Sequence, residues 1–402
     1  MAQSQTPQDE QDLGEPQFAY HAVVEPIFIV GVMIASCYFN RLRNFSIIPS
    51  SKQDQGLLGQ TKPEPWDEED VHDETERLNL ADAASPTETH PPKKRTCCGT
   101  VIHTPNSSRY AKYWHSRFIQ KFPFLVEMFY WAVNLLFYVG VKSASELIAA
   151  TDGVWQTAEN HGKAVLWFEH EGPFSWLFPL REIDVQAFFR NDHQTMLTIL
   201  NRAYSLIHIP VTVSFLAWYY YAAPTHAQFA EARRMMTLTN LFSFVVFTTY
   251  PCMPPRLLPE EYGFFDTVRR EDAESIYATN KFFNQLAAFP SLHFGYSFCI
   301  GTVLLYHSGL FRRRLAPREK RMSKAWQVFF VVLSIVYPAF VLTIIVATAN
   351  HYWLDAMAAT VVVLVAWLSN RILLGLLPLE DLFLWCVKLE KPFPTTGNRG
   401  GK

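Results

Sequence analysis

Seven long apolar runs constrain this chain more than any other feature of its sequence. A helix that crosses a bilayer needs roughly 17 to 25 mostly apolar residues, and each run has about that length. Charge concentrates instead between Arg41 and Lys121. The pattern predicts an all-α integral membrane protein with a polar insert. The expected spans cover residues 22–39, 122–141, 196–221, 234–250, 290–310, 326–348 and 352–377.

The first run is expected to remain as a membrane anchor. It contains Glu25 and Pro26, and it lacks the basic start and the cleavage site of a signal peptide. The insert is expected to be mostly disordered, because segments such as WDEEDVHDETE are rich in charge and poor in large apolar residues. We therefore expect a tail with the first transmembrane helix (1–40), a cytosolic insert (41–120), a transmembrane domain (121–380) and a C-terminal tail (381–402).

Basic residues near the ends of the spans predict the orientation of the chain. The loop 312–324 holds seven lysines and arginines, and basic residues also flank the insert. Because cytosolic loops carry an excess of such residues, both segments are expected in the cytosol. Seven spans then leave the C-terminus in the cytosol. Loops 142–195 and 251–289, with the short turn 349–351, are expected on the opposite, lumenal side.

Two polar clusters lie at the lumenal ends of predicted spans. In NHYWLDA, His351 and Asp355 are four residues apart and share one face of a helix. An aspartate that accepts a hydrogen bond from one imidazole nitrogen raises the basicity of the other, so His351 is a candidate nucleophile. In AAFPSLHFGYSF, Ser291 and His293 follow Pro290 at a helix N-terminus, where backbone N–H groups and the helix dipole attract anions such as phosphate.

A third cluster, YPCMPPRLLPEEYGFFDT, carries Arg256, whose guanidinium can bind phosphate oxygens through parallel hydrogen bonds. Each cluster alone also has a plain structural explanation: an interfacial histidine, a capping aspartate or a proline-rich turn. The predicted orientation nevertheless brings all three clusters to the same face of the membrane. That coincidence favours a single phosphate-binding site.

Residues 196–222 add a candidate pocket. Tyr204 and His208 are four residues apart in an apolar span, and intramembrane polar groups usually face a bundle interior or a cavity. They either contact a lipid head group or make hydrogen bonds between helices. Segments 154–170 and 176–190 are amphipathic and are expected to lie along the lumenal surface over the site.

Other kinds of site find no support in the sequence. The six cysteines form no C-x-x-C pair and no zinc spacing, and the chain has no glycine-rich phosphate loop and no nucleic-acid-binding pattern. We therefore expect no metal, no cofactor and no nucleic-acid partner. The expected partners are a lipid phosphoester and the bilayer, and the sequence identifies no regulatory subunit.

The motifs FPSLHFG and NHYWLD resemble two signatures of the type 2 phosphatidic acid phosphatase superfamily, Ser-x-His-x-Gly and His-x-x-x-Asp. Within it, the chain is most similar to the branch of inositol phosphorylceramide synthases, which are inositolphosphotransferases. The likeness runs from about residue 158 to residue 377. It implies a six-helix phosphatase or phosphotransferase core, here with one extra N-terminal transmembrane helix, and a metal-independent active site at one membrane face.

The resemblance also implies roles for individual residues. His351 would attack phosphorus to form a phosphohistidine while Asp355 holds its ring. His293 would steady the phosphoryl oxygens and protonate the leaving alkoxide, and Arg256 would clamp the phosphate. Together with the pocket residues of the 196–222 segment, the expected substrate-binding set is Arg256, Ser291, Gly295, Tyr204 and His208.

Two positions depart from the family pattern. The usual first motif places a lysine seven residues before an Arg-Pro, whereas Thr249 stands at that spacing here and Arg256 follows its prolines. The synthases tend to read His-His-Tyr where this chain has Asn350 before His351. These departures concern the phosphate clamp and the choice of substrate.

The sequence therefore favours a lipid phosphotransferase that passes phosphoinositol from phosphatidylinositol to ceramide or a similar alcohol. A lipid phosphate phosphatase needs the same nucleophile and acid, with water as the acceptor. A non-catalytic lipid-binding membrane protein is a further hypothesis, but it offers no chemical reason to keep both histidines and Asp355. Family likeness implies a Golgi or other secretory-pathway membrane, with the active site on the lumenal side.

Overall fold

Helices make up most of the folded chain. The computed structural model describes residues 21–43, 45–48, 91–97, 100–149, 153–266, 286–311 and 322–396. Its α-helices are α1 (His21–Phe39), α4 (Trp114–Lys121), α5 (Phe124–Ala149), α6 (Val154–His170), α7 (Glu182–Asp192), α8 (Gln194–Ala222), α9 (His226–Thr249), α11 (Leu292–His307), α12 (Lys324–Ala347), α13 (Trp353–Leu368) and α14 (Leu377–Cys386). The 3₁₀ helices are η2 (Ser107–Tyr110), η3 (Ser175–Leu177), η4 (Pro255–Leu257), η5 (Glu260–Tyr262) and η6 (Asn370–Leu376), and the strands are β1 (Lys93–Cys97) and β2 (Thr100–Thr104).

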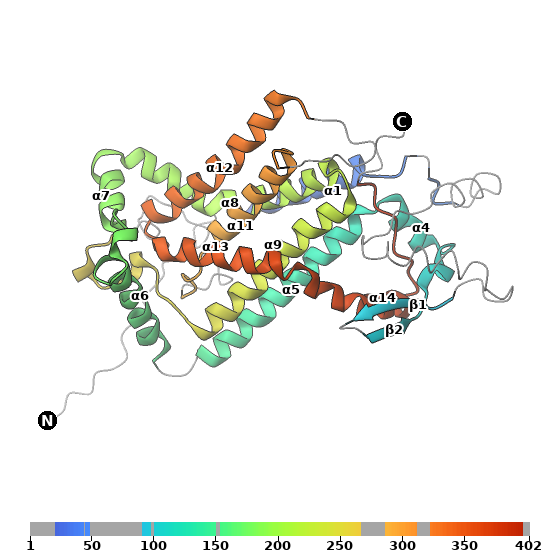
Figure 1. Cartoon of the computed structure of the whole chain (residues 1–402), viewed down its shortest axis with the longest axis horizontal. Coiled ribbons are helices and arrows are strands. Elements are labelled where there is room, and N and C mark those ends of the chain that lie inside the picture. The colour runs from blue at the N-terminus through green and yellow to red at the C-terminus, as the bar shows by residue number, and fades with distance from the viewer. Residues whose placement is uncertain are drawn as a thin grey trace.

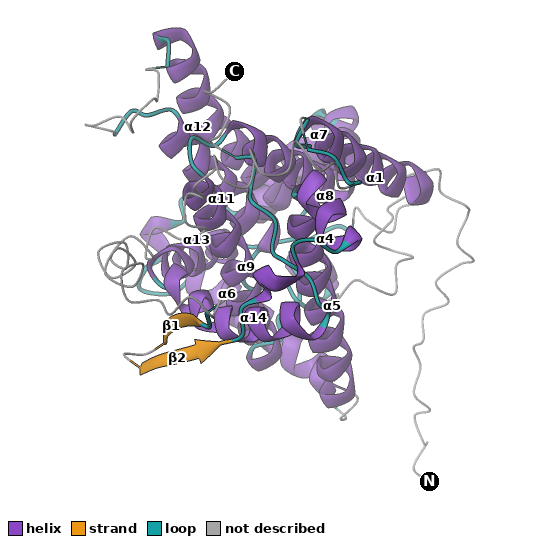
Figure 2. Cartoon of the chain, turned by 90° about the vertical axis from the view of Figure 1, so that its right-hand side faces the viewer, coloured by secondary structure: helices purple, strands orange, loops and turns teal. Residues whose placement is uncertain are grey.

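The long helices run lengthwise between two different end regions. Figure 1 shows α5, α8, α9, α11 and α13 in the body of the molecule, with α6 and α7 at one end. The antiparallel hairpin β1–β2 lies with α4 and α14 at the other end, which faces the viewer in Figure 2. The apolar core between these helices includes Tyr219, Phe229, Met236, Ile300 and Val363. Burial of such large side chains is the main favourable term that holds the helices together.

Helices cover each of the predicted spans, but they differ in length and apolarity. Phe124–Val141 and Lys324–Ala347 are long and apolar enough to cross a membrane. Trp353–Leu368 and Asn370–Cys386 would make a third span if the 54° bend between them belongs to one crossing, and Val24–Phe39 is a shorter apolar helix. The expectation of a mostly helical membrane protein is confirmed. The count of six core spans plus one stays a prediction.

The C-terminal region differs from the sequence expectation in one respect. The seventh span was expected to continue to residue 377, but α13 ends at Leu368 and the chain bends through η6 into α14. The expected boundary at residue 380 therefore falls inside a helix. Long apolar stretches set the approximate place of a span, whereas the point at which a helix breaks depends on local packing.

Part of the predicted polar insert is folded into the hairpin. Asp381 of α14 accepts hydrogen bonds from Arg95 Nε at 2.9 Å, Lys93 Nζ at 3.2 Å and Thr104 Oγ1 at 2.8 Å. These charge-assisted contacts fasten the hairpin to the bundle, and composition could not predict them because the partners are far apart in sequence. The acidic stretch WDEEDVHDETE and most of the basic loop 312–324 lie outside the described residues.

Close packing of α11 against α12 depends on a glycine. A Cβ atom added to Gly301 would lie 2.6 Å from the backbone oxygen of Ser334 and 2.8 Å from Pro338 Cγ. Neither atom is the flexible end of a side chain, so the helices themselves would have to separate.

We expect Gly301→Ala to lower the free energy of unfolding by about 1–3 kcal/mol, the usual cost of overpacking. Gly140→Ala in α5 is a matched control, because its Cβ would meet nothing within 4 Å. That control should be neutral or slightly stabilising, since alanine favours a helix. Thermal unfolding of both variants in the same detergent tests the difference, and equal midpoints would contradict the close approach of α11 and α12.

Candidate active site

A tight turn before α13 presents His351 to the interior of the bundle. Ala349 in this turn has a left-handed backbone conformation, with φ of 51°, which residues other than glycine seldom adopt. Its carbonyl accepts the backbone N–H of Arg256 at 3.0 Å. The turn is thereby fastened to the segment that carries the candidate phosphate clamp.

Two acceptors define the protonation of His351. Its Nδ1 lies 2.8 Å from the backbone oxygen of Ala288 and 3.1 Å from Asp355 Oδ2. A backbone carbonyl can only accept a hydrogen bond, so Nδ1 is the donor and carries a proton. Asp355 Oδ2 also accepts the Tyr352 N–H at 2.9 Å, so one carboxylate orients the imidazole and caps α13. Neither hydrogen bond uses Nε2, which is therefore the candidate nucleophilic nitrogen of His351.

The second histidine lies across from the first. The ring centroid of His293 is 5.7 Å from that of His351, and both residues line the same pocket. Ser291 caps α11 by accepting the Phe294 N–H on its hydroxyl at 3.3 Å. The Ser291 N–H donates to the backbone oxygen of Asp355 at 3.2 Å, so the start of α11 is joined to the first turn of α13. The separation of the two rings is suited to one phosphoryl group between them.

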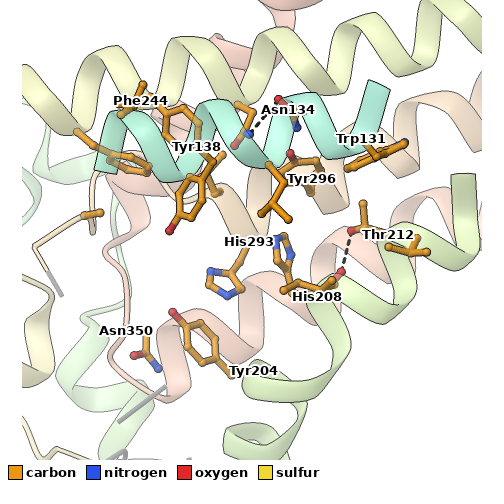
Figure 3. A pocket seen from close by; sticks show the side chains of 18 of the residues that line it. Trp131, Asn134, Tyr138, Tyr204, His208, Thr212, Phe244, His293, Tyr296 and Asn350 are labelled. Atoms are coloured by element: carbon orange, nitrogen blue, oxygen red, sulfur yellow. Dashed lines mark hydrogen bonds between the residues drawn. The ribbon is translucent and has the colours of Figure 1, made fainter. Parts of the chain in front are cut away.

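The polar residues expected on α8 belong to this site. Tyr204 stacks on His293 with a centroid distance of 4.2 Å, and His208 lies 4.6 Å from His293 on its other side. Figure 3 shows both side chains projecting from α8 toward His293. The structure therefore brings Tyr204 and His208 to the histidines, and it favours a role in the pocket over contacts elsewhere between helices.

Arg256 also reaches the pocket, and Asn350 holds it there. Arg256 Nε donates to Asn350 Oδ1 at 2.8 Å, and its Nη1 donates to Asp266 at 3.1 Å. Asn350 is itself oriented by the hydrogen bond from its Nδ2 to Thr348 Oγ1 at 2.7 Å. The residue that departs from the synthase pattern thus positions the guanidinium. For Arg256 Nη2, the described chain shows no hydrogen-bond partner, so donors stay available for a ligand.

Sequence reasoning missed a cluster of buried carboxylates at the start of α13. Glu169 of α6 accepts the Leu354 N–H at 2.5 Å, and Glu182 of α7 accepts the Trp353 N–H at 3.3 Å. His170 Nε2 contacts Glu182 at 2.7 Å. In the sequence, Glu169 and His170 lie in the segment LWFEHEG, which does not by itself indicate that they are buried. These side chains fix the helix end that carries His351 and Asp355.

Charge is unevenly shared between the two glutamates. Burial raises the pKa of the Glu169 carboxyl, and the neighbouring Glu182 raises it further, so Glu169 is protonated at neutral pH. Burial also acts on Glu182, but hydrogen bonds from His170 and Glu169 outweigh it and hold the pKa of Glu182 below its usual value. Glu169, His170 and Glu182 are close enough to hold a metal ion. Both carboxylates, however, are already used by backbone N–H groups of α13.

The candidate site opens into a pocket of about 670 Å³, a typical size for a ligand site. His293, His351 and Arg256 line one part of it. Apolar residues of α1, α5 and α9, such as Met33 and Phe244, line much of the rest. A pocket with clustered polar groups and a long apolar wall suits an amphiphilic ligand.

Two predicted substrate-binding residues lie behind the pocket wall. Ser291 is fully buried and its hydroxyl caps α11. Gly295 faces Thr239, Ala359 and Val363, where an added Cβ would make only ordinary contacts. Neither is among the residues that line the pocket, so their direct contact with substrate stays a prediction.

The protonated state of Glu169 leads to a prediction on stability. Glu169→Gln keeps an acceptor for the Leu354 N–H and should stay near the parent in thermal unfolding at mildly acidic pH. Glu169→Ala leaves that buried N–H without its partner and should lose about 1–3 kcal/mol. Because burial raises the folded pKa of Glu169 from 4.5 to about 11, the stability contributed by its protonated form is complete below the unfolded pKa and is lost progressively as pH rises from there to the folded pKa. The glutamine variant should lack this loss, and the exposed Glu171→Ala is the control. Equal effects of glutamine and alanine would contradict the capping role.

Comparison with known proteins adds one match. Neither a search of curated proteins nor a search of solved structures returned a significant match. A family model described as the PAP2 superfamily matches residues 175–317. This segment contains α8, Arg256 and His293, while His351 and Asp355 follow it and join it through the Ser291–Asp355 hydrogen bond. The match supports a lipid phosphatase or phosphotransferase enzyme.

Proposed function

We propose that this chain is a membrane-embedded, metal-independent lipid phosphotransferase of the inositol phosphorylceramide synthase type. It would transfer phosphoinositol from phosphatidylinositol to ceramide or a similar alcohol. The observation that carries the proposal is the state of His351. Its Nδ1 is hydrogen-bonded to Ala288 and Asp355, so the neutral imidazole has its lone pair on Nε2, and the residue lines a lipid-sized pocket beside His293.

In the first step, His351 Nε2 attacks phosphorus and forms an N–P bond. The bond from phosphorus to the diacylglycerol oxygen breaks, and His293, which enters this step as the imidazolium paired with the anionic phosphate of the bound lipid, donates its proton to that oxygen. The imidazole of the phosphohistidine then carries positive charge, which the Asp355 carboxylate stabilises at 3.1 Å. Arg256 binds the phosphoryl oxygens through its Nη2 donors, which no described residue uses. Such preorganised groups each lower a barrier by a few kcal/mol.

In the second step, the acceptor hydroxyl attacks the phosphohistidine and the N–P bond breaks. His293, now neutral, takes the proton of that hydroxyl, so the enzyme returns to its starting state. If water is the acceptor, the same steps make the chain a lipid phosphate phosphatase. The two activities share every catalytic residue and differ in which acceptor the pocket admits.

The proposed site of action is the lumenal face of a secretory-pathway membrane, such as the Golgi. The support is the excess of basic residues in loop 312–324 and around the predicted insert, which favours the cytosol for those segments. The turn before α13 and the start of α11 would then lie on the opposite side. The sequon at Asn106 offers a check, because a glycan on Asn106 would overturn this orientation.

His351→Ala should abolish turnover, because it removes the nucleophile. Purified protein is incubated with phosphatidylinositol labelled in its head group and with ceramide, and the lipid products are resolved. The parent chain should form a labelled phosphoinositol ceramide. His103→Ala, an exposed histidine in β2, is the matched control and should keep full activity.

Release of only inositol phosphate would reject the transferase in favour of a phosphatase. Retention of turnover in His351→Ala would reject the phosphohistidine mechanism.

Arg256→Lys should lower kcat/KM on the order of 10²-fold, although the positive charge is kept. Lysine cannot make the contacts to Asn350 and to phosphate at the same time, because it lacks the planar fork of donors. Steady-state kinetics on the same lipid pair measure the effect. Arg202→Lys, at an exposed position of α8, is the control and should change little. Parent-like kinetics of Arg256→Lys would show that the guanidinium does not clamp the phosphate.

A further inference from the structure

A pair of asparagines interrupts the apolar wall of the pocket. Asn134 of α5 and Asn240 of α9 both line it, and Asn240 Nδ2 lies 3.5 Å from Asn134 Oδ1. The Asn134 side chain also interacts with the hydroxyl of Tyr296 on α11. Figure 3 shows Asn134 above Tyr296, on the side of the pocket opposite Tyr204. Three helices therefore bring polar groups to one place in an apolar surrounding.

This cluster has more hydrogen-bonding capacity than it uses. Two carboxamides together offer four N–H donors and two oxygens with two lone pairs each. The contact between them is long, at the outer limit of a hydrogen bond, and it uses one donor and one lone pair. With the Tyr296 contact added, the described residues still use only part of the capacity. Polar groups at membrane depth are costly unless a partner satisfies them, so they usually face a functional cavity. A ligand in the pocket can supply the partner.

The cluster lies at a suitable depth below the histidines. Tyr296 follows His293 by three residues of α11, which is a rise of about 4.5 Å along the helix axis. In a lipid with a phosphorylated primary alcohol, the nitrogen or oxygen of the chain linkage is about four bonds from phosphorus, or roughly 5 Å. A phosphoryl group between the histidines therefore brings that linkage to the asparagines.

Beyond the asparagines the pocket becomes apolar. Trp131 and Met128 continue along α5, and Met33 of α1 lines the same pocket. From Asn134 to Met128 the helix rises by about 9 Å, which is room for a substantial length of hydrocarbon chain. The order along α5 is thus a polar cluster followed by an apolar wall, in the direction away from the catalytic histidines.

We propose that Asn134, Asn240 and Tyr296 form a subsite that hydrogen-bonds the amide linkage of a long-chain lipid. The inference rests on the proposed function and specifies the lipid class that the same site accepts. An amide both donates through its N–H and accepts through its oxygen, so it matches the mixed donors and acceptors of two carboxamides. An ester linkage accepts only, so the donor phosphatidylinositol can use the asparagine N–H groups but leaves the asparagine oxygens without a donor. The subsite thereby favours an amide-linked over an ester-linked acceptor in the second step.

The test compares ceramide and diacylglycerol of equal chain length as acceptors of label from phosphatidylinositol whose acyl chains differ in length from those of the acceptors, so that each labelled product can be resolved from the donor. The parent chain should prefer ceramide. Asn240→Leu should lower kcat/KM for ceramide by about 10-fold or more, as expected when hydrogen bonds in a buried site are lost. Its kcat/KM for diacylglycerol should change by less than about 3-fold on the same grounds, so the preference collapses. If the chain uses water as acceptor, hydrolysis of ceramide 1-phosphate and of phosphatidic acid replaces the two transfer reactions and gives the same ratio.

Controls separate this subsite from a contact that only joins helices. Ser243→Ala lies on α9 near Asn240 and outside the pocket lining, and it should leave the ratio unchanged. If Asn240→Leu does not fold, Asn134→Leu removes the same cluster from α5. An equal loss on both lipids, with an unchanged ratio, would overturn the proposal. Absence of turnover in the parent chain would instead count against the proposed function, because no selectivity is then measured.

Discussion

The N-terminal end of α13 depends on three acidic side chains, and the candidate site depends on that helix end. The first turn of a helix has backbone N–H groups without partners inside the helix. Here Asp355 accepts the Tyr352 N–H, Glu182 the Trp353 N–H and Glu169 the Leu354 N–H. Asp355 also accepts a hydrogen bond from His351. The same carboxylate therefore caps α13 and orients the candidate nucleophile. The helices α6 and α7 supply two of the three acceptors, so the end region beyond the bundle supports the site directly.

Helix α6 also restricts movement of the turn that carries His351. Tyr352, next to His351, donates its hydroxyl hydrogen to the Met253 oxygen at 2.8 Å. A Cβ on Gly162 of α6 would lie 2.7 Å from that hydroxyl and 2.8 Å from the same oxygen. The absence of a side chain at Gly162 therefore lets α6 approach the turn that carries His351. Close packing and buried hydrogen bonds together restrict the imidazole to one orientation, which is the kind of preorganisation that catalysis needs.

Some features of the candidate site could be predicted from residue type and spacing, and others could not. The spacing of His351 and Asp355 predicts their contact, but not its geometry, because it assumes that both residues lie on one helix face. In the structure His351 lies in the turn before α13, and Asp355 reaches back to it from the first turn of that helix. The neighbourhood of His293 and Tyr204 could be expected from their common depth. The Ala288 carbonyl, in contrast, is a backbone atom, and no residue type marks it. Glu169 sits in an amphipathic segment where a charged residue normally faces water, so only the folded chain reveals its burial against α13.

Transfer and hydrolysis differ in what occupies the pocket when the N–P bond breaks. Both need a hydroxyl placed in line with His351 Nε2, and water is small enough to fit wherever a lipid hydroxyl does. The histidines therefore cannot select a lipid hydroxyl over water. Water is excluded only if the acceptor lipid fills the pocket. A lipid acceptor whose chain covers the apolar wall along α5 and α1 displaces water from it. In the subsite proposed above, a polar contact with Asn134 and Asn240 would fix how deep such a chain lies, and with it the position of the hydroxyl relative to phosphorus. The proposal therefore makes the outcome of the reaction depend on residues of α5 and α9 that take no part in the chemistry.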